Sequence, residues 1–278
     1  MRSMAIEYEV LISTCDKFSD LWDAHILLME RNWKTHGKAY LVTDAATDRR
    51  YEGLEVVCAG ADTEITRRLQ IALDQVKTKY ILFTLDDYFL TEPVDEDALQ
   101  RTLAVMEDAQ LDYVWLDSRH NPYMPTRQEL RREGAVELED HSGYYLRNLA
   151  EGNYKVSLYP GLWRTDFMRQ TLEETRNSWQ YEVALTEMAH QLSAHCAVSC
   201  HGEFPFLDVI RKGKVLRKAD RYFRRNPIYR SNREVMGFWA EWMLTARMWL
   251  KRVLPKSVFN LLKKVLIKCG MTFYSPVK

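Results

Sequence analysis

Two adjacent carboxylates, Asp86 and Asp87, follow directly on the apolar run Tyr80–Leu85 (YILFTL). Such a run is typical of a central parallel strand that is covered on both faces. Ligands of open α/β sheets bind beyond the carboxyl ends of the strands. Neighbouring carboxylates there repel each other unless a cation or several donors compensate them. A divalent cation (Mg²⁺ or Mn²⁺) that bridges to a diphosphate would do this. The pair therefore predicts a metal site, although the same residues could simply cap the following turn.

The elements that would position this pair alternate between strands and helices. Short apolar runs predict strands at residues 7–14, 38–43, 54–58, 80–85 and 112–116. Apolar residues at helical spacing predict helices at residues 18–33, 63–77 and 95–109. Strands that alternate with helices are typical of an α/β fold with a mainly parallel sheet flanked by helices.

The pattern becomes irregular after Asp117. Residues 118–160 are rich in Tyr, Arg and turn residues, which predicts loops or a small antiparallel hairpin around a site. Beyond them we expect helices at 165–175 and 181–193 and strands at 194–199 and 204–210. From residue 221 the chain is basic and aromatic. We therefore divide it into a body, residues 1–220, and a helical tail, residues 221–278.

Charge is segregated along the 278 residues. The totals of 39 basic and 39 acidic residues cancel, but residues 211–278 hold 18 basic and 3 acidic residues. The first 210 residues hold 21 basic and 36 acidic ones. A basic tail on an acidic body indicates that the tail meets an anionic partner, such as a membrane, a phosphate or a nucleic acid.

The tail has the pattern of basic amphipathic helices. Apolar residues recur at helical spacing over residues 235–254 and again over 258–266. Arg247, Lys251 and Arg252 interrupt any run that could span a bilayer. A basic helix with tryptophans can lie in the plane of the membrane interface. We expect residues 235–268 to bind an anionic membrane surface, with packing on the body or pairing of two subunits as the alternative.

The sequence also predicts a compartment. The opening residues MRSMAIEYEV lack the apolar run of a secretory signal. The 5 cysteines are scattered and odd in number, which does not indicate a disulfide framework. We expect a cytoplasmic protein that is peripheral on the inner face of the plasma membrane.

Six segments, in order along the chain, carry a resemblance to a known family. They are VLIST (10–14), LVTD (41–44), ITRRL (65–69), FTLDDYFL (83–90), VSLYPGLWRTDFM (156–168) and SWQYE (178–182). Together they resemble bacterial glycosyltransferases of the GT-A fold that take part in surface-polysaccharide assembly. The resemblance covers about residues 6–216. One feature departs from it: many members of the wider fold carry Asp-x-Asp, whereas Asp86 and Asp87 are adjacent.

The resemblance implies a GT-A-like (Rossmann-like) sheet, a nucleotide diphosphate sugar as donor, and a saccharide or lipid-linked acceptor. Residues 1–117 would bind the donor and residues 118–220 the acceptor. The implied donor-binding residues, all polar or charged, are Ser13, Thr14, Asp16, Asp44, Arg67, Asp86, Arg211 and Lys214. Lys212 would add charge, and Gly213 would let the backbone approach. Thr14 and Asp16 could instead only cap a helix, and Arg67 could be solvated.

Glycosyl transfer must deprotonate the acceptor hydroxyl and stabilise the departing diphosphate. The resemblance implies Glu182 as the base of an inverting reaction, with Asp87 and its metal at the diphosphate. Glu182 stands at the start of an expected helix, where the dipole would lower the pKa of its carboxyl and keep it ionised. Glu187 and Asp208 are the competing carboxylates.

Aromatic and histidine residues complete the candidate set. Trp163 and Trp179 could stack on the apolar faces of sugars, although both could be core residues. His120, in a loop without an identified partner, is expected to be structural. The run from His195 to His201 holds two cysteines and two histidines, but they crowd together and lack the separated pairs of a zinc site. A strand with buried thiols explains this run better.

Two other functions fit parts of the sequence. A sugar nucleotidyltransferase shares the fold, but it normally has a glycine-rich loop after the first strand, and the segment STCDKFSD has no glycine. A nucleic-acid-binding module would use the basic tail, but the acidic body opposes a large footprint and no recognition motif is present. We therefore expect a nucleotide-sugar donor and a saccharide acceptor as partners, and no nucleic acid.

Overall fold

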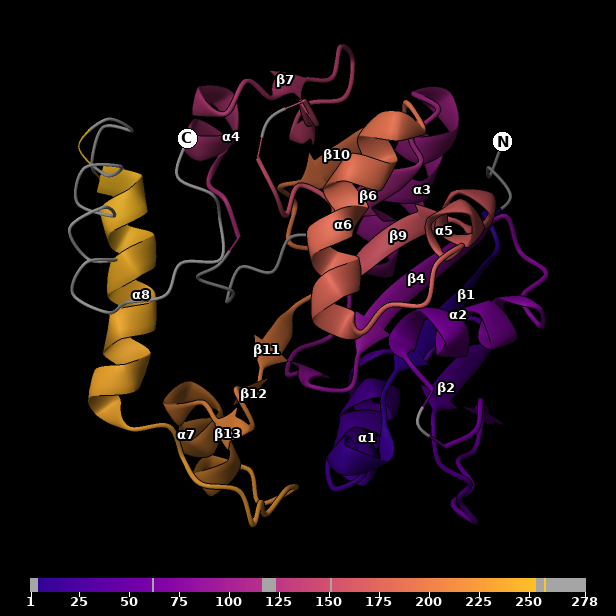
Figure 1. Ribbon diagram of the computed structural model, residues 1–278, viewed down its shortest axis with the longest axis vertical. Coiled ribbons are helices and arrows are strands. Elements are labelled where there is room, and N and C mark those ends of the chain that lie inside the picture. Colours follow the sequence, from indigo (N-terminus) through magenta and orange to yellow (C-terminus); the bar gives the residue numbers. More distant parts are fainter. Residues whose placement is uncertain (1–4, 62, 117–123, 151, 254–257, 259–278) are drawn as a thin grey trace.

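A nine-stranded sheet forms the centre of the protein (Figure 1). The computed structural model describes residues 5–61, 63–116, 124–150, 152–253 and 258. In spatial order, the strands of the sheet are β3 (Leu54–Cys58), β2 (Ala39–Thr43), β1 (Tyr8–Ser13), β4 (Tyr80–Leu85), β9 (Gly161–Arg164), β6 (Tyr113–Trp115), β10 (Cys196–Ser199), β8 (Tyr144–Leu146) and β7 (Val136–Glu137). Two small sheets pair β5 (Tyr88–Leu90) with β11 (Phe206–Asp208) and β12 (Ile210–Arg211) with β13 (Lys214–Val215).

The helices lie mostly on the two faces of this sheet (Figure 1). They are α1 (Trp22–Asn32), α2 (Ile65–Leu73), α3 (Glu96–Asp108), α4 (Arg127–Arg132), α5 (Thr165–Thr171), α6 (Ser178–Gln191), α7 (Arg217–Arg225) and α8 (Phe238–Val253), with a short 3-10 helix at Asp16–Phe18. The predicted α/β class is confirmed. The expected strands at 54–58 and 80–85 match the observed ones residue for residue, and residues 124–150 and 152–160 form loops, a short helix and the β7–β8 hairpin.

The direction of the strands makes the sheet mixed but mostly parallel. β1 pairs in parallel with β2 and β4, β2 with β3, and β6 with β10. β9 runs against both β4 and β6, and β8 runs against β10 and β7. The carboxyl ends of β1, β2, β4 and β6 therefore lie at one edge of the sheet, together with the start of β9.

Alternate residues of each strand face opposite layers, because successive side chains of a strand point to opposite faces. On one face, Leu11 and Phe83 pack with apolar residues of α2, α5 and α6. On the other face, Val10 and Leu82 pack with α1 and α3. Gly161 lets β9 approach β6 closely, since a Cβ there would lie 2.8 Å from the ring of Tyr113. The result is a three-layer structure with the sheet between two layers of helices.

A third apolar cluster extends the body beyond residue 220. It joins the start of α1 and β5 to residues of α7 and the chain after it, including Phe223, Tyr229 and Met236. All three side chains are buried. Residues 221–236, which the sequence assigned to the tail, thus pack with the body.

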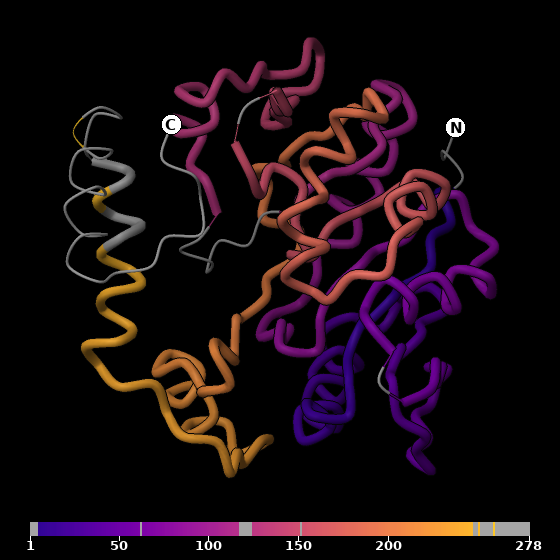
Figure 2. The backbone as a smooth tube through the Cα atoms, in the orientation of Figure 1, coloured from indigo at the N-terminus to yellow at the C-terminus, as the bar shows by residue number. Residues whose placement is uncertain are grey.

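Helix α8 stands apart from the sheet at the left of Figure 1, and Figure 2 traces its connection to the body through α7. The expected helical character of the tail is confirmed for 238–253, whereas 254–257 and 259–278 lie outside the described residues. In the part of the chain that is described, no helix has the length and apolar character needed to cross a membrane.

Candidate active site

The carboxyl ends of β1 and β4 meet through Thr14 and Asp86. The Thr14 hydroxyl donates a hydrogen bond to Asp86 Oδ2 and accepts one of 2.6 Å from Trp22 Nε1. The Asp86 amide donates to the carbonyl of Ser13, at 3.4 Å. Burial raises the pKa of Asp86 to about 7, with a further rise from Asp20, against the lowering effect of the bond from Thr14. Asp86 is thus hydrogen-bonded to the end of β1 through both its backbone and its side chain.

Asp87 faces a different set of groups. Its backbone carbonyl accepts a 2.9 Å bond from the amide of Val209, just beyond β11. Strand β11 pairs with β5, which places Asp208 opposite Tyr88. Oδ1 of Asp87 and Oδ1 of Asp208 are both buried without a hydrogen-bond partner. Burial raises the pKa of both carboxyls, and that of Asp87 is raised further by Asp208 and Asp86.

Arg211 supplies the positive charge beside these carboxylates. Its Nε donates a 2.8 Å bond to Asp208 Oδ2, and its Nη2 donates to the hydroxyl of Tyr159. The Tyr159 ring stacks on Tyr88, with centroids 5.2 Å apart, and on Trp115, at 5.3 Å. Because Tyr159 precedes β9, this stack fixes the guanidinium at the same edge of the sheet as Asp87.

Glu182 reaches the site from α6. Helix α6 begins after Asn177, whose side chain accepts a bond from the amide of Gln180 while the Gln180 side chain accepts one from the Asn177 amide. Oε1 of Glu182 accepts a 3.4 Å bond from the amide of Leu158, which lies just before Tyr159. Burial raises the pKa of Glu182, and the Leu158 amide and Arg211 oppose the rise. The expected lowering by the helix dipole is therefore corrected: Glu182 lies past the first turn of α6, and burial dominates.

The end of β2 brings Asp44 to the same edge of the sheet. Asp44 Oδ1 accepts a 2.7 Å bond from the amide of Asp16, and its Oδ2 lies 4.0 Å from Nη1 of Arg68. Arg68 is buried, and its Nε has no hydrogen-bond partner. Arg67 instead is exposed and donates to Gln70, at 3.2 Å. The structure thus places Arg68, and not the expected Arg67, beside the strand ends.

Other expected site residues lie away from this cluster. Trp163 is completely buried among Phe83, Tyr113 and Phe167, so it has no face for a sugar and its expected acceptor role does not fit. Trp179 is 55% exposed near the start of α6, close in sequence to Glu182. His120 lies outside the described residues.

The hairpin of β12 and β13 carries Arg211 inward but turns its tip outward. Lys212 and Gly213 have φ values of 52° and 74°, the combination typical of a two-residue hairpin turn. Gly213 has no atoms near its missing Cβ and thus serves the turn, not a close approach. Lys214 forms a surface ion pair of 2.6 Å with Glu234. The two lysines contribute no contact to the carboxylate cluster.

The predicted strand in the run His195–His201 is confirmed, with Cys196 buried in β10. Over the described ranges, no group of three or more His, Cys, Asp and Glu side chains has the arrangement of a metal site. Asp87 and Asp208 provide only two carboxylates. Their buried oxygens without a hydrogen-bond partner fit a cation whose remaining ligands come from a bound molecule.

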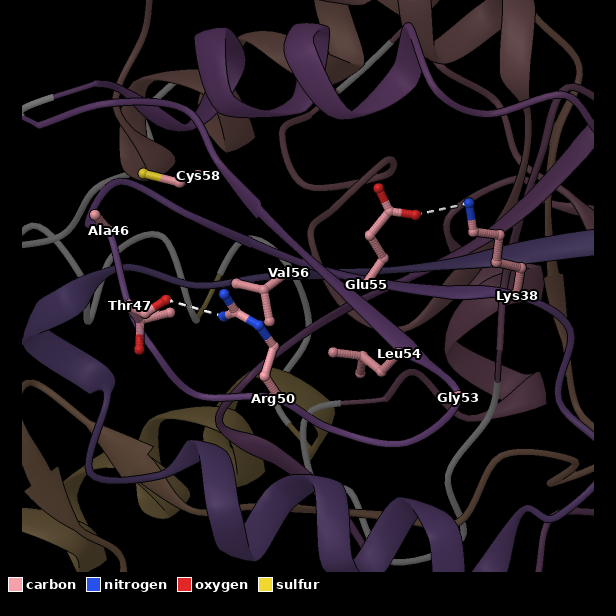
Figure 3. Close-up of a pocket in the computed structure, with 9 residues that line it drawn as sticks. All are labelled: Lys38, Ala46, Thr47, Arg50, Gly53, Leu54, Glu55, Val56 and Cys58. Atoms are coloured by element: carbon pink, nitrogen blue, oxygen red, sulfur yellow. Dashed lines mark hydrogen bonds and ion pairs between the residues drawn. The ribbon is translucent and has the colours of Figure 1, made fainter.

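A hollow of about 730 Å³ lies elsewhere, along the edge strand β3 (Figure 3). Lys38 and Glu55 form an ion pair of 2.7 Å there, and Arg50 donates a 3.2 Å bond to the carbonyl of Thr47. The lining shares no residue with the cluster around Asp87. We therefore do not assign the candidate active site to this hollow.

Sequence reasoning missed two members of the site. Tyr159 lies in the quoted segment 156–168, but only the pairing of β9 with β6 reveals that it stacks on Trp115. Arg68 could have been found, because it falls between Ile65, Leu69 and Ala72 on the buried stripe of α2.

The comparisons with known proteins concern the fold. No protein-family model matches the chain, and no curated protein matches it. The mannosyltransferase PcManGT from Pyrobaculum calidifontis, solved with GDP-Man and Mn²⁺, aligns with a TM-score of 0.50 and 12% identity, over 74% of this chain and 58% of its own. S. aureus TarS 1–349 aligns at 0.49 and 15%, over 72% and 60%, and its complex with UDP-GlcNAc at 0.48 and 16%, over 92% and 70%.

At such identities the similarity shows the fold alone. The chain spans 60% of the length of TarS 1–349 in the first of these alignments and 58% of the mannosyltransferase. Together with the mostly parallel sheet, the match to the mannosyltransferase confirms the GT-A-like fold that the sequence predicted.

Proposed function

We propose that this chain is a glycosyltransferase that moves a hexosyl group from a nucleotide diphosphate sugar to a saccharide acceptor. The observation that carries the proposal is the convergence of Asp87, Asp208, Arg211 and Glu182 at the carboxyl edge of a GT-A-like sheet. Open α/β sheets bind ligands at this edge. Residues 1–117 would bind most of the donor, and residues 118–220 would bind the acceptor and contribute Asp208 and Arg211 at the donor's diphosphate.

The departing diphosphate would lie beside Arg211 and Asp87. The guanidinium has donors in a planar fork that matches phosphate oxygens. Asp87 and Asp208 would hold a divalent cation through their unpartnered oxygens, and the cation would neutralise charge on the diphosphate. Asp208 and Tyr159 orient Arg211, so the guanidinium needs little rearrangement when the diphosphate binds.

Glu182 would take the proton from the acceptor hydroxyl in an inverting reaction. Its pKa is raised by burial, which makes the carboxylate a stronger base once ionised. Oε1 is oriented by the amide of Leu158, at 3.4 Å. Trp179, exposed three residues earlier, offers an aromatic face on which an acceptor sugar could stack.

A ligand screen followed by one substitution tests this function. UDP, GDP, CMP and dTDP sugars, with and without Mn²⁺ or Mg²⁺, should raise the melting temperature for the matching donor only. Glu182→Gln should keep that shift but reduce turnover by about 10²–10⁴-fold, because the amide cannot accept the proton. Glu187→Gln, an exposed position on the same helix, is the matched control. Full turnover by Glu182→Gln would contradict the assignment of the base.

We further propose a lipid-linked acceptor in surface-polysaccharide assembly, reached by docking on the cytoplasmic face of an anionic membrane. The exposed side chains of α8 support this: Phe238, Trp239, Trp242 and Met243 are 46–71% exposed. The neighbouring helix α7 carries exposed basic residues, and its Arg217 guanidinium lies 5.6 Å from the Phe238 ring centre. Aromatic side chains beside basic ones are typical of helices that lie in a membrane interface.

Vesicle co-sedimentation of the full chain tests the docking surface. Trp239→Glu with Trp242→Glu should lower binding to anionic vesicles at low salt by at least about tenfold, because it adds charge to the face that would enter the interface. Leu27→Glu changes a comparably exposed apolar residue on α1 and should leave binding intact. Equal binding by both variants would contradict the proposal. Loss of a dimer without any vesicle binding would show that the face pairs two copies.

A further inference from the structure

The segment 229–236, here called the strap, lies between α7 and α8. It contacts two parts of the candidate site, the loop after β1 and the hairpin of β12 and β13. Arg233 makes a two-bond contact with Asp20 in the loop between β1 and α1: Nη2 lies 2.6 Å from Oδ1, and Nε lies 2.9 Å from Oδ2. Nη2 also donates a 2.7 Å bond to the carbonyl of Lys17. The guanidinium lies 4.7 Å from the ring centre of Phe18.

The contact is half-exposed, but it is part of a larger set of interactions. The Arg233 side chain is 16% and the Asp20 side chain 41% exposed, and Asp20 Oδ2 also accepts a 2.8 Å bond from the hydroxyl of Tyr229. The Tyr229 ring packs on Phe223 and Phe89 in the third apolar cluster. Burial acts to raise the pKa of Asp20, but the bonds from Arg233 and Tyr229 hold it below its usual value. The contact therefore stays charged around neutral pH.

The loop that Arg233 holds is the one that carries the donor side of the site. The same stretch of chain contains Thr14, which bonds to Asp86, and Asp16, whose amide bonds to Asp44. Asp20 and Arg233 shift the pKa of Asp86 in opposite directions, which places the contact within electrostatic reach of the end of β4.

The other end of the strap is tied to the hairpin that carries Arg211. The amide of Val215 in β13 donates a 2.9 Å bond to the carbonyl of Glu234, and the amide of Met236 donates a 2.8 Å bond back to Val215. Arg211 lies in β12, the strand paired with β13. The strap thus contacts both the loop after β1 and the hairpin of Arg211.

We propose that Arg233 is a positioning residue that fixes the loop after β1 relative to the Arg211 hairpin and so sets the affinity for the nucleoside diphosphate part of the donor. This inference rests on the proposed function for the identity of the ligand. Its structural part, the restraint of residues 14–20, does not depend on that function.

Two measurements on the full chain test the inference separately. Backbone hydrogen exchange without ligand should show faster exchange at the amides of Phe18, Ser19 and Leu21 in Arg233→Gln than in the wild-type chain. Arg224→Gln is the matched control, because Arg224 pairs with Asp220 at 2.9 Å on the surface of α7, away from the loop. Equal exchange in the two variants would overturn the restraint, whatever the chain binds.

Titration with UDP and with GDP, and turnover of the sugar donor, provide the functional measurement. Arg233→Gln should raise the Kd for the diphosphate and the KM for the donor about tenfold, with kcat within about threefold of wild type, because a displaced loop weakens binding more than chemistry. Arg233→Lys should recover only part of the affinity, since lysine cannot make the two-bond contact. An unchanged Kd in a variant with faster exchange would overturn the affinity role. No diphosphate binding by the wild-type chain would refute the proposed function together with that role, while the exchange result would still decide the restraint.

Discussion

Asp86 and Asp87 are neighbours in the chain, yet they face two different regions of the protein. Asp86 lies toward α1, where Thr14 donates to its carboxylate and Trp22 donates to Thr14. Asp87 lies toward β11, where its Oδ1 and that of Asp208 are buried without a partner. A protein hydroxyl thus bonds to the Asp86 carboxylate, whereas the Asp87 region holds carboxylate oxygens that no described protein group satisfies.

The difference indicates two roles for one pair of residues. Buried polar atoms are nearly always hydrogen-bonded, and an exception calls for an explanation such as an ion or a ligand. Oδ2 of Asp86 has a hydrogen-bond partner in Thr14. The buried Oδ1 atoms of Asp87 and Asp208 have none and call for such an explanation. We therefore expect substitutions near Asp86 to act on stability, and substitutions near Asp87 to act on catalysis.

Among the substitutions that compare these two regions, Asp87→Asn should have the largest effect, and the effect should be on turnover. Removing one preorganised electrostatic group from a transition state costs about 10²–10³-fold in kcat. The melting temperature should stay the same or rise, because the substitution removes repulsion between Asp87 and Asp208. Donor turnover and thermal unfolding of the same sample check both parts. Turnover within tenfold of wild type in a folded Asp87→Asn protein would show that the unpartnered Oδ1 of Asp87 has no catalytic role.

Thr14→Val tests the other region. The substitution keeps the shape of the side chain but leaves Trp22 Nε1 and Asp86 Oδ2 without their shared hydroxyl, at a cost of about 1–3 kcal/mol in the free energy of unfolding. Denaturant unfolding measures it. Thr35→Val, whose hydroxyl donates to Glu96 in an exposed contact, is the matched control and should change stability by less than about 0.5 kcal/mol. Similar losses in both variants would remove the distinction between the two regions.

The pH dependence of stability is the third test. Asp86 has a pKa of about 7 in the folded protein and an ordinary value of 3.8, so between these values the native state binds more protons than the unfolded state. Stability should therefore fall as the pH rises from about 4 to about 7, by up to about 1.4 kcal/mol per pH unit for one such group. Asp86→Asn should make this slope shallower. An unchanged slope in the variant would show that other buried carboxyls cause the whole effect.

Local patterns account for what the sequence predicted well. The strand before Asp86 was placed residue for residue because Tyr80–Leu85 is an apolar run with polar residues after it. Its position at the carboxyl edge of a parallel sheet then followed from general topology. Ser13, Thr14 and Asp44, which were named through the resemblance, lie at or just after the ends of β1 and β2, at the same edge.

Long-range packing accounts for what it could not predict. The insertion of β9 between β4 and β6 buries Trp163 and brings Tyr159 against Trp115, and no local pattern encodes the order of strands in a sheet. The meeting of Asp208 with Asp87 depends on the pairing of β11 with β5, across more than a hundred residues of chain. The raised pKa of Glu182 likewise follows from its burial against Leu158, which the helix position alone did not reveal.

Tyr159→Phe should have the smallest effect and tests how firmly the Asp87 region is positioned. The substitution keeps the stacks on Tyr88 and Trp115 but removes the hydroxyl that accepts a bond from Arg211. Arg211 keeps its 2.8 Å bond to Asp208, so we expect a loss of about 1 kcal/mol, or about fivefold in kcat/KM for the donor. Tyr88→Phe alters the other ring of the stack and should change kcat/KM by less than twofold. A fivefold loss of kcat/KM in Tyr159→Phe, without a loss in Tyr88→Phe, would show that Arg211 must be held by both Asp208 and Tyr159 for full turnover. Negligible losses of kcat/KM in both variants would show that Asp208 alone orients the Arg211 guanidinium.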